Sequence, residues 1–254
     1  MHNQLQQTVN ARYHELDPHN RVRLPVIFAW LQEVGAEHAL QLGVGLKDLK
    51  KLGLTWVLSR LTLELQRPIR GTEQVTVTTW PVTREGRFSI RDYLLTDQQG
   101  KDIGRATSSW AAINLKSRRP VKIDEHLPHY PLHPLRALDD PFDTLPALDQ
   151  CRTMLQLPVL RADLDMNNHV NNTVYPGWAL EAVPEELFSR SVPLLIEIGF
   201  RSEALYGDSI RSCCAPLGTD PRVLLHRIES VKDGTELCRL RTTWQPVAPR
   251  RQSE

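Results

Sequence analysis

The chain repeats itself, and this internal repeat constrains the fold more than any other feature of its 254 residues. Similar residues recur at an offset of 148 positions early in each copy (165 − 17), 136 in the middle (207 − 71) and 134 near the end (244 − 110). The matched pairs are Leu16 and Leu164, Asp17 and Asp165, Val22 and Val170, Trp30 and Trp178, Glu33 and Glu181, Gly71 and Gly207, Gly100 and Gly234, Ile103 and Leu237, Arg105 and Arg239, Ser109 and Thr243, and Trp110 and Trp244. Ordered matches with such small changes in offset indicate two copies of one folding unit.

Each copy has the pattern of one helix followed by an antiparallel sheet. In the first copy, apolar residues recur at helical spacing from Leu24 and predict a helix that extends to about Lys50, despite Gly35 and Gly43. Alternating and β-branched stretches then predict four strands, at residues 55–66, 75–80, 88–96 and 103–113. This order is typical of an α+β unit. Because the offset falls by 12 (148 − 136) before the strands, the first copy has the longer helical segment.

The repeat predicts two units, residues 1–119 and 151–254, joined by a linker at residues 120–150. We expect the two sheets to lie edge to edge as one continuous, pseudo-twofold sheet, because this arrangement leaves no long unpaired strand in water. Prolines interrupt the linker and exclude regular structure over most of its length; they are Pro120, Pro128, Pro131, Pro134, Pro141 and Pro146. The linker is therefore expected to cross the surface.

Composition excludes several classes of protein. The formal net charge of +1 leaves no basic surplus to neutralise phosphates, so we expect no nucleic-acid partner. No stretch resembles a signal peptide or a membrane span, which favours a cytoplasmic protein without a membrane partner. We predict no cofactor. We also predict no metal at His126, His129 and His133 of the linker, because the interleaved prolines prevent a fixed ligand geometry.

The four cysteines are expected to be buried free thiols. Cys213 and Cys214 are neighbours, which would point to opposite faces of a strand, and no pair that includes Cys151 or Cys238 has C-x-x-C spacing. This usage is typical of a reducing compartment.

The most polar stretch of the chain precedes the helix of the second copy. Residues 163–172 contain two aspartates, four asparagines and one histidine, directly ahead of an apolar segment with Tyr175 and Trp178. Asp and Asn commonly cap helices, and Asp163 has this interpretation as well as that of a site residue. A helix start also offers unpaired N–H donors to an oxyanion, and here an imidazole stands beside them.

The first copy serves as an internal control for this stretch. It has Arg21 in the place of His169 and, counted back four residues from the shared glycine, Arg67 in the place of Glu203. Asn167 is replaced as well. The fold evidently tolerates these replacements, which favours a functional site in the second copy over a structural cap.

The motif Asp165-x-Asn167-x-His169-Val170-Asn171-Asn172, with Tyr175, Trp178 and Glu181 after it, closely resembles the catalytic segment of the acyl-acyl-carrier-protein thioesterases of plants and bacteria. The resemblance covers nearly the whole chain, including the duplication and the linker. It implies a tandem (double) hotdog fold, in which a curved antiparallel sheet wraps a long helix in each unit. It also implies a catalytic set of Asp165, Asn167, His169 and Glu203, the last on a strand 34 residues after the histidine (203 − 169).

By this resemblance, the chain hydrolyses the thioester of a phosphopantetheine-linked acyl group on acyl-carrier protein and releases free fatty acid, which ends chain elongation in fatty acid biosynthesis. The reaction needs an activated water, a stabilised oxyanion and a leaving thiol. Glu203 or His169 would accept the proton of the water, Asn167 would orient the water or the thioester, and Asp165 would fix the imidazole. A covalent acyl–Glu203 intermediate is a further route.

Other residues receive more general predictions. Asn171, Asn172 and the backbone N–H groups that follow are expected to meet the substrate and its oxyanion. The interior of the first unit, whose polar set is degenerate, is expected to hold the acyl chain near Phe28, Leu31, Trp56 and Leu58. Arg161 and Arg201 flank the site and are candidates for contact with the carrier protein, or are solvated charges. The two glutamates Glu33 and Glu181 are interpreted as structural, and Trp30 and Trp178 as core residues.

Two positions depart from the family pattern, and two other functions stay open. Ala204 follows the acid where many plant members have a cysteine, so the chain must work without that thiol. Pro176 is tolerable only within the first turn of a helix. The alternatives are an acyl-coenzyme A thioesterase of the same fold and a lipid-binding protein without catalysis. A homodimer is also considered.

Overall fold

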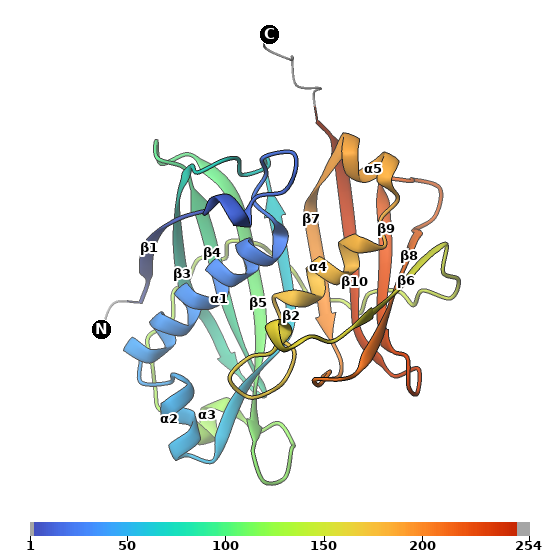
Figure 1. The fold of residues 1–254 in the computed structure, drawn as a ribbon. Helices are drawn as coiled ribbons and strands as arrows, with labels where there is room; N and C mark the ends of the chain where they lie inside the picture. Colours follow the sequence, from blue (N-terminus) through green and yellow to red (C-terminus); the bar gives the residue numbers. More distant parts are fainter. Residues whose placement is uncertain (1–2, 248–254) are drawn as a thin grey trace. The chain divides into compact units, whose positions relative to one another are not determined.

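The computed structural model describes residues 3–247, which divide into two compact units with a boundary between residues 143 and 144 (Figure 1). The ends of the predicted units, at residues 1–2 and 248–254, lie outside the described residues. The predicted edge-to-edge arrangement of the two sheets stays a prediction.

Unit 1 (residues 1–143) is an antiparallel sheet with a long helix packed on it. Its helical elements are a 3-10 turn at Tyr13–Glu15, α1 (Leu24–Gln41), α2 (Leu46–Lys51) and α3 (Ile123–His126). Its strands are β1 (Leu5–Asn10), β2 (Leu54–Leu65), β3 (Gln74–Glu85), β4 (Phe88–Thr96) and β5 (Asp102–Asn114), in the spatial order β1-β3-β4-β5-β2. The four strands predicted from the sequence are confirmed.

Unit 2 (residues 144–254) repeats this arrangement. Its helical elements are a 3-10 turn at Arg161–Asp163, α4 (Val174–Glu181) and α5 (Glu185–Arg190). Its strands are β6 (Thr153–Pro158), β7 (Ser191–Phe200), β8 (Ser209–Pro216), β9 (Val223–Ser230) and β10 (Glu236–Pro246), in the order β6-β8-β9-β10-β7. The same order of five strands in both units confirms the duplication and the α+β class.

The helical segment of unit 1 is longer, as predicted, but it is not one helix. α1 has 18 residues and α4 has 8. The predicted continuation to about Lys50 is wrong beyond Gln41, because Gly43 adopts a left-handed conformation with φ 73° and ends α1 before α2 starts. Gly35 stays inside α1, where an added Cβ would lie 2.8 Å from the hydroxyl of Tyr93 on the sheet.

The first part of the proline-rich segment, up to residue 143, packs against the sheet of unit 1. On β4, Asp92 faces away from α1, and its carboxylate accepts the N–H of Ala137 at 2.6 Å and the Nε–H of Arg136 at 3.1 Å. The indole N–H of Trp80 on β3 donates to the carbonyl of Leu135 at 2.8 Å. Ile123 of the short helix α3 packs in the buried cluster with Leu42 and Leu49. Residues up to 143 thus belong to unit 1.

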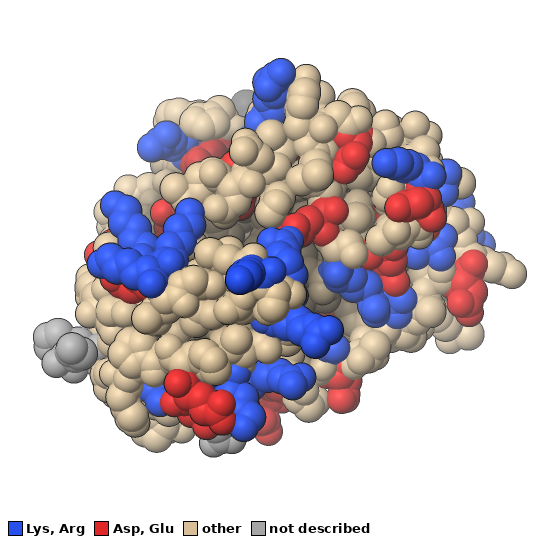
Figure 2. Space-filling view, turned by 90° about the horizontal axis from the view of Figure 1, so that it is seen from below, with Lys and Arg blue, Asp and Glu red and all other residues tan. Residues whose placement is uncertain are grey.

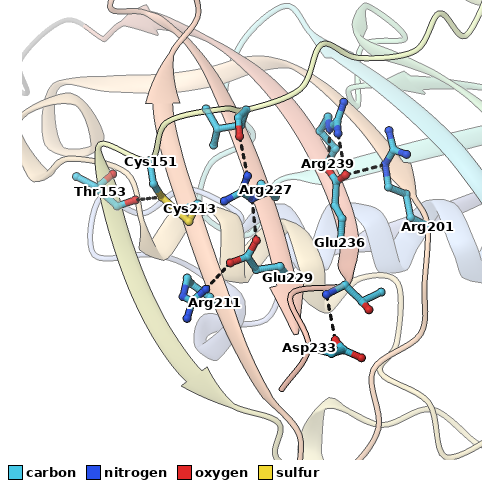
Figure 3. A network of polar contacts seen from close by, with 12 residues as sticks. Cys151, Thr153, Arg201, Arg211, Cys213, Arg227, Glu229, Asp233, Glu236 and Arg239 are labelled. Atoms are coloured by element: carbon cyan, nitrogen blue, oxygen red, sulfur yellow. Dashed lines mark hydrogen bonds and ion pairs between the residues drawn. A yellow bond between two sulfur atoms is a disulfide. The ribbon is translucent and has the colours of Figure 1, made fainter. Parts of the chain in front are cut away.

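The prediction of free thiols is wrong for two of the four cysteines. Cys151, just ahead of β6, forms a disulfide with Cys213 on β8, with their Cα atoms 5.4 Å apart (Figure 3). The two are 62 residues apart in sequence, and only the pairing of β6 with β8 brings them together. Cys214 and Cys238 are free and buried, as predicted.

Within residues 3–247 no helix has the length and apolar character needed to span a bilayer. In the same residues, no three His, Cys, Asp or Glu side chains are grouped so that they could bind a metal ion. Two of the linker histidines have protein partners. His133 lies 2.8 Å from the Nε2 atom of Gln4, and the Nδ1 atom of His126 lies 3.0 Å from the carbonyl oxygen of Lys122.

Candidate active site

The Asp165–His169 segment is a tight loop that Asp165 holds together. Its carboxylate Oδ1 accepts the backbone N–H of Asn167 at 2.7 Å and that of His169 at 3.2 Å. Asn168 takes a left-handed conformation with φ 62°, which Asn tolerates better than most residues. The loop closes where the N–H of Asp165 donates to the carbonyl of His169 at 2.8 Å. The sequence therefore folds into a rigid turn that presents the imidazole.

Unit 1 contains the same loop, which shows what Asp165 is for. Asp17 Oδ1 accepts the backbone N–H of His19 at 2.8 Å and that of Arg21 at 2.9 Å, and Asn20 has a φ of 59°. The aspartate is thus common to both copies and serves the turn. We expected Asp165 to fix the imidazole, whereas its side-chain hydrogen bonds go to the backbone of the loop and to the amide of Asn167 at 3.4 Å.

His169 and Glu203 lie together, as the sequence predicts for the proposed site. The imidazole Nε2 is 3.5 Å from the carboxylate Oε2, and the two side chains are 32% and 45% exposed. Glu203 does not lie on a strand, because β7 ends at Phe200 and the carboxylate stands in the loop that follows. The N–H of Val170 donates to the carbonyl of Ala204 at 3.0 Å and ties this loop to the motif.

The structure corrects which residue of unit 1 corresponds to Glu203. In unit 1 the N–H of Val22 donates to the carbonyl of Ile69 at 2.9 Å, in the way that Val170 donates to Ala204. Ile69 therefore matches Ala204, and Pro68 rather than Arg67 matches Glu203. Counting back four residues from the shared glycine gave Arg67 because the turn before the glycine has one more residue in unit 2 than in unit 1. The absence of an acid from this position of unit 1 still holds.

In unit 1 the loop is closed by an ion pair. The Nε atom of Arg21 lies 2.6 Å from the Oδ2 atom of Asp17, and the two side chains are only 7% and 11% exposed. The cation in the place of the imidazole is thus neutralised by the aspartate of its own turn. Within residues 3–247 no cation forms an ion pair with Asp165 of unit 2, and the imidazole of His169 faces the carboxylate of Glu203 instead.

Tyr175 on α4 supports the loop that carries Glu203, and sequence reasoning missed this role. Its buried ring packs edge-on against Phe200 at 5.6 Å between centroids, and its hydroxyl forms a hydrogen bond with the backbone of Ala204. Burial raises the pKa of this phenol, so it stays protonated. At the offset of 148, unit 1 has Ile27, which is also buried. The replacement of this isoleucine by a tyrosine in unit 2 is the sequence signal that could have indicated a role for Tyr175 beyond packing.

We expect Tyr175→Phe to lower the turnover rate by roughly tenfold while the protein stays folded, because the ring still fills its site and only the hydrogen bond to the Glu203 loop is lost. The measurement is kcat with KM and a pH–rate profile, together with thermal unfolding. Tyr13→Phe, which removes an exposed phenol in unit 1, is the matched control. An unchanged kcat and pH profile would contradict a positioning role.

The start of α4 is organised by Asn171. Its side-chain oxygen accepts the N–H and the hydroxyl of Thr173, each at 3.0 Å, and its carbonyl accepts the N–H of Val174 at 3.0 Å. Two of the amides expected to meet an oxyanion are therefore already bonded to Asn171, which orders the turn ahead of Thr173, the N-cap residue of α4. Asn172 is partly exposed. Pro176 lies within the first turn, as required.

The residues predicted to hold an acyl chain all belong to unit 1, but they do not form one group. Phe28 and Leu31 are buried in the first half of α1. Leu58 is buried on β2, and Trp56 is partly buried and donates its indole N–H to the carbonyl of Val44 at 2.9 Å. Trp56 packs with the cluster beyond the end of α1, which includes Leu42, Val44, Leu49, Leu54 and Ala112.

The other predicted residues have simple surroundings. Arg161 lies over the ring of Tyr206 at 4.2 Å, and the Nε atom of Arg201 lies 3.4 Å from a carboxylate oxygen of Glu236, which Arg239 also binds (Figure 3). Asp163 accepts the N–H of Leu160 and caps the 3-10 turn, as one of its two interpretations predicts. The tryptophans Trp30 and Trp178 are core residues, as predicted, and the glutamates Glu33 and Glu181 are exposed.

Comparison with known sequences identifies a family for both units. The profile of the acyl-ACP thioesterase N-terminal domain matches residues 2–129, and that of the C-terminal domain matches residues 147–246. The chain is 30% identical over 269 residues to oleoyl-acyl carrier protein thioesterase 1, chloroplastic, of Arabidopsis thaliana, with 92% of the chain and 74% of that protein covered. It is 28% identical over 258 residues to a palmitoyl-acyl carrier protein thioesterase of Cuphea hookeriana, with 94% and 62% covered.

Comparison with solved structures agrees on the fold. An acyl-ACP thioesterase from Bacteroides thetaiotaomicron superposes with a TM-score of 0.82 at 25% identity, with 96% of this chain and 98% of that chain covered. The 12:0-ACP thioesterase from Umbellularia californica gives a TM-score of 0.83 at 24% identity, with 97% and 99% covered, and this match shows the fold alone. The tandem hotdog fold predicted from the sequence is confirmed.

Proposed function

This chain belongs to the acyl-ACP thioesterase family, and we propose that it uses His169 and Glu203 of unit 2 to hydrolyse acyl-acyl-carrier protein and release free fatty acid. One observation carries the assignment of the site. The imidazole and the carboxylate lie 3.5 Å apart in unit 2, whereas the same loop of unit 1 holds an arginine bonded to its own aspartate. The acid–base pair is therefore not a requirement of the fold.

The proposed reaction follows from this geometry. His169 accepts a proton from a water molecule, whose oxygen attacks the thioester carbonyl carbon. Glu203 orients the imidazole and stabilises the imidazolium, in the manner of the carboxylate in a catalytic triad. The tetrahedral intermediate then breaks its carbon–sulfur bond, and the imidazolium returns the proton to the leaving thiolate. Asn167, which is exposed and follows Asp165 in the loop, orients the water or the carbonyl oxygen.

The oxyanion needs donors, and the start of α4 limits which ones are available. Asn171 already accepts the N–H groups of Thr173 and Val174, and proline at position 176 has no N–H. We therefore assign the oxyanion to the backbone and side-chain amides of Asn172, with Asn167 as the second donor. Asn171 then acts on the substrate only through the turn that it orders ahead of α4.

The carrier is the second part of the proposal. Arg161 and Arg201 are exposed beside the site and would meet acidic groups of a carrier protein or the phosphate of its phosphopantetheine. On the face drawn in Figure 2, Lys and Arg side chains (blue) lie among Asp and Glu (red), which fits a local contact better than binding to nucleic acid. A cytoplasmic location and a homodimer remain predictions.

The test compares one acyl group presented on acyl-carrier protein and on coenzyme A, with release of free fatty acid as the measurement. We expect a higher kcat/KM with the carrier protein, because both substrates carry the phosphopantetheine phosphate and only the carrier protein adds acidic side chains for the two arginines to meet. An equal or higher value with coenzyme A would support the alternative acyl-CoA thioesterase. Tight acyl binding without any hydrolysis would support a lipid-binding protein instead.

The acyl chain is proposed to lie in unit 1 beside Trp56 and Leu58, because Trp56 is the least buried of the four predicted residues. Replacing either by alanine should shift the preferred acyl chain to greater length, since each truncation leaves apolar space that additional methylenes fill. The measurement is kcat/KM over a series of chain lengths. Phe28→Ala and Leu31→Ala are the matched comparisons, and an unchanged preference in the Trp56 and Leu58 variants would refute this placement.

A further inference from the structure

In each sheet, residues that lie directly opposite one another on neighbouring strands form a row across the sheet. One such row differs between the two units at a single chemically important position. In unit 1 the residues directly opposite one another are Pro81, Arg91, Ser108 and Leu61, on β3, β4, β5 and β2. In unit 2 the row is Pro216, Leu224, Thr242 and Ile196, on β8, β9, β10 and β7. In both units a tryptophan two residues further along the strand donates its indole N–H to the hydroxyl of the row, at 2.9 Å. Arg91 is therefore the counterpart of Leu224.

Leu224 shows that this fold packs well with an apolar side chain at the position of Arg91. Burying a guanidinium there is unfavourable, and burial lowers the pKa of Arg91, whose side chain is left only 8% exposed. Among the described residues no carboxylate forms an ion pair with it. The neighbouring Asp92 points to the opposite face of the sheet. The arginine is thus present for a reason other than stability of the fold.

Arg91 is the centre of a polar layer between α1 and the sheet, made by Arg91, His38, Thr79 and Tyr93. The Nη1 atom of Arg91 lies 3.0 Å from His38 Nδ1 and donates to the hydroxyl of Thr79 at 3.2 Å. The phenol of Tyr93, opposite Thr79 in the register, hydrogen-bonds with Thr79 and with Ser108. The four residues of the layer are all buried.

Apolar residues of unit 1 lie on both sides of the layer along α1 and the sheet. On one side lie Phe28 and Leu31 of α1, and seven residues, or about 10 Å of helix, separate Leu31 from His38. On the other side lies Trp56 with its apolar cluster, and Leu58 is opposite Trp110, two residues along β5 from Ser108 in the row of Arg91. Gly35 brings α1 so close to Tyr93 that no side chain would fit between them. An apolar chain that follows α1 from one of these groups toward the other therefore passes the layer.

We propose that the polar layer sets the greatest acyl chain length that this enzyme accepts, with Arg91 as the specificity-determining residue. The inference rests on the proposed function and on the acyl chain lying in unit 1. A methylene that enters the layer separates buried polar groups from their partners and offers no hydrogen bond in exchange. Chain extension is therefore favourable up to the layer and unfavourable beyond it.

The experiment measures kcat/KM for saturated acyl groups of increasing length, on the same carrier protein, with native enzyme and three variants. Arg91→Leu installs the residue that unit 2 already carries, and Arg91→Met removes the charge but keeps most of the length. We expect both to raise kcat/KM about tenfold or more for the first chain beyond the native limit, relative to the preferred chain. Leu224→Met, the matched change in unit 2, should leave the profile unchanged.

Three results would overturn the inference. The first is folded Arg91→Leu and Arg91→Met variants that accept no longer acyl chains than the native enzyme. The second is an equal increase in accepted chain length in Leu224→Met. The third is a native enzyme whose kcat/KM shows no sharp fall at any chain length. If Arg91→Leu does not fold, the same chain-length series is measured with Arg91→Met and His38→Gln, and an unchanged longest accepted chain in both would overturn the inference. Native enzyme that hydrolyses no acyl thioester would contradict the proposed function instead, so the two failures are distinguishable.

Discussion

His169→Ala should lower the rate of fatty acid release by about 10³-fold, because it removes the group that takes a proton from water and returns it to the leaving thiolate. Glu203→Gln keeps the shape of the partner but removes its charge, and it should lower the rate by roughly 10²-fold. The measurement is kcat under saturating acyl-carrier protein, with thermal unfolding to show that each variant is folded.

The two changes should not be additive, because the imidazole and the carboxylate act as a unit across 3.5 Å. The double variant should therefore be nearly as active as His169→Ala alone. Glu181→Gln, which removes an exposed carboxylate from α4 of the same unit, is the matched control and should leave the rate unchanged. Hydrolysis that survives both single changes would show that the site is elsewhere.

A larger loss in Glu203→Gln than in His169→Ala would assign the proton transfer to the carboxylate, or indicate an acyl–Glu203 intermediate. The two routes differ in the fate of oxygen. In heavy-oxygen water, attack by water on the thioester places labelled oxygen only in the released fatty acid. An acyl–enzyme that forms on Glu203 would also carry label into the carboxylate over repeated turnovers when the water attacks the glutamyl carbon.

Much of the fold could be predicted from the sequence because its signals are local. Alternation of apolar residues predicted β2, and shared glycines at turns preserved the repeat across the chain. Strands β1 and β6 were missed because each has only six residues and, at a sheet edge, buries little of its surface. The disulfide between Cys151 and Cys213 was missed because no local pattern reports which strands pair.

The candidate site was predictable in outline for the same reason. The motif places His169 in a turn whose aspartate and asparagine have strong local preferences, so its shape follows from sequence. The loop that carries Glu203 is set by pairing with that turn, and a glycine count assigned it the wrong counterpart by one residue. The match of Arg91 with Leu224 was invisible because it occurs at an offset of 133 (224 − 91), which only the register of the sheets reveals.

Asp17→Ala should destabilise the protein far more than Asp165→Ala, although the two aspartates hold the same turn. In unit 1 the change removes the carboxylate that lies 2.6 Å from the buried guanidinium of Arg21, and breaking a buried ion pair should cost about 3 kcal/mol in the free energy of unfolding. In unit 2 the change removes the acceptor of two backbone N–H groups in a partly exposed loop, for a loss of about 1 kcal/mol.

Activity should respond in the opposite order, and this contrast separates the roles of the two copies. Asp165→Ala frees the turn that presents His169, so kcat should fall about 10²-fold in protein that is still folded. Asp17→Ala, assayed below its unfolding transition, should keep most of its kcat because unit 1 contributes no group to the reacting atoms. Chemical denaturation and initial rates on one acyl substrate give both quantities. Equal losses of stability in the two variants would mean that the Asp17–Arg21 pair does not close unit 1 as argued, and equal losses of kcat would remove the assignment of chemistry to unit 2 alone.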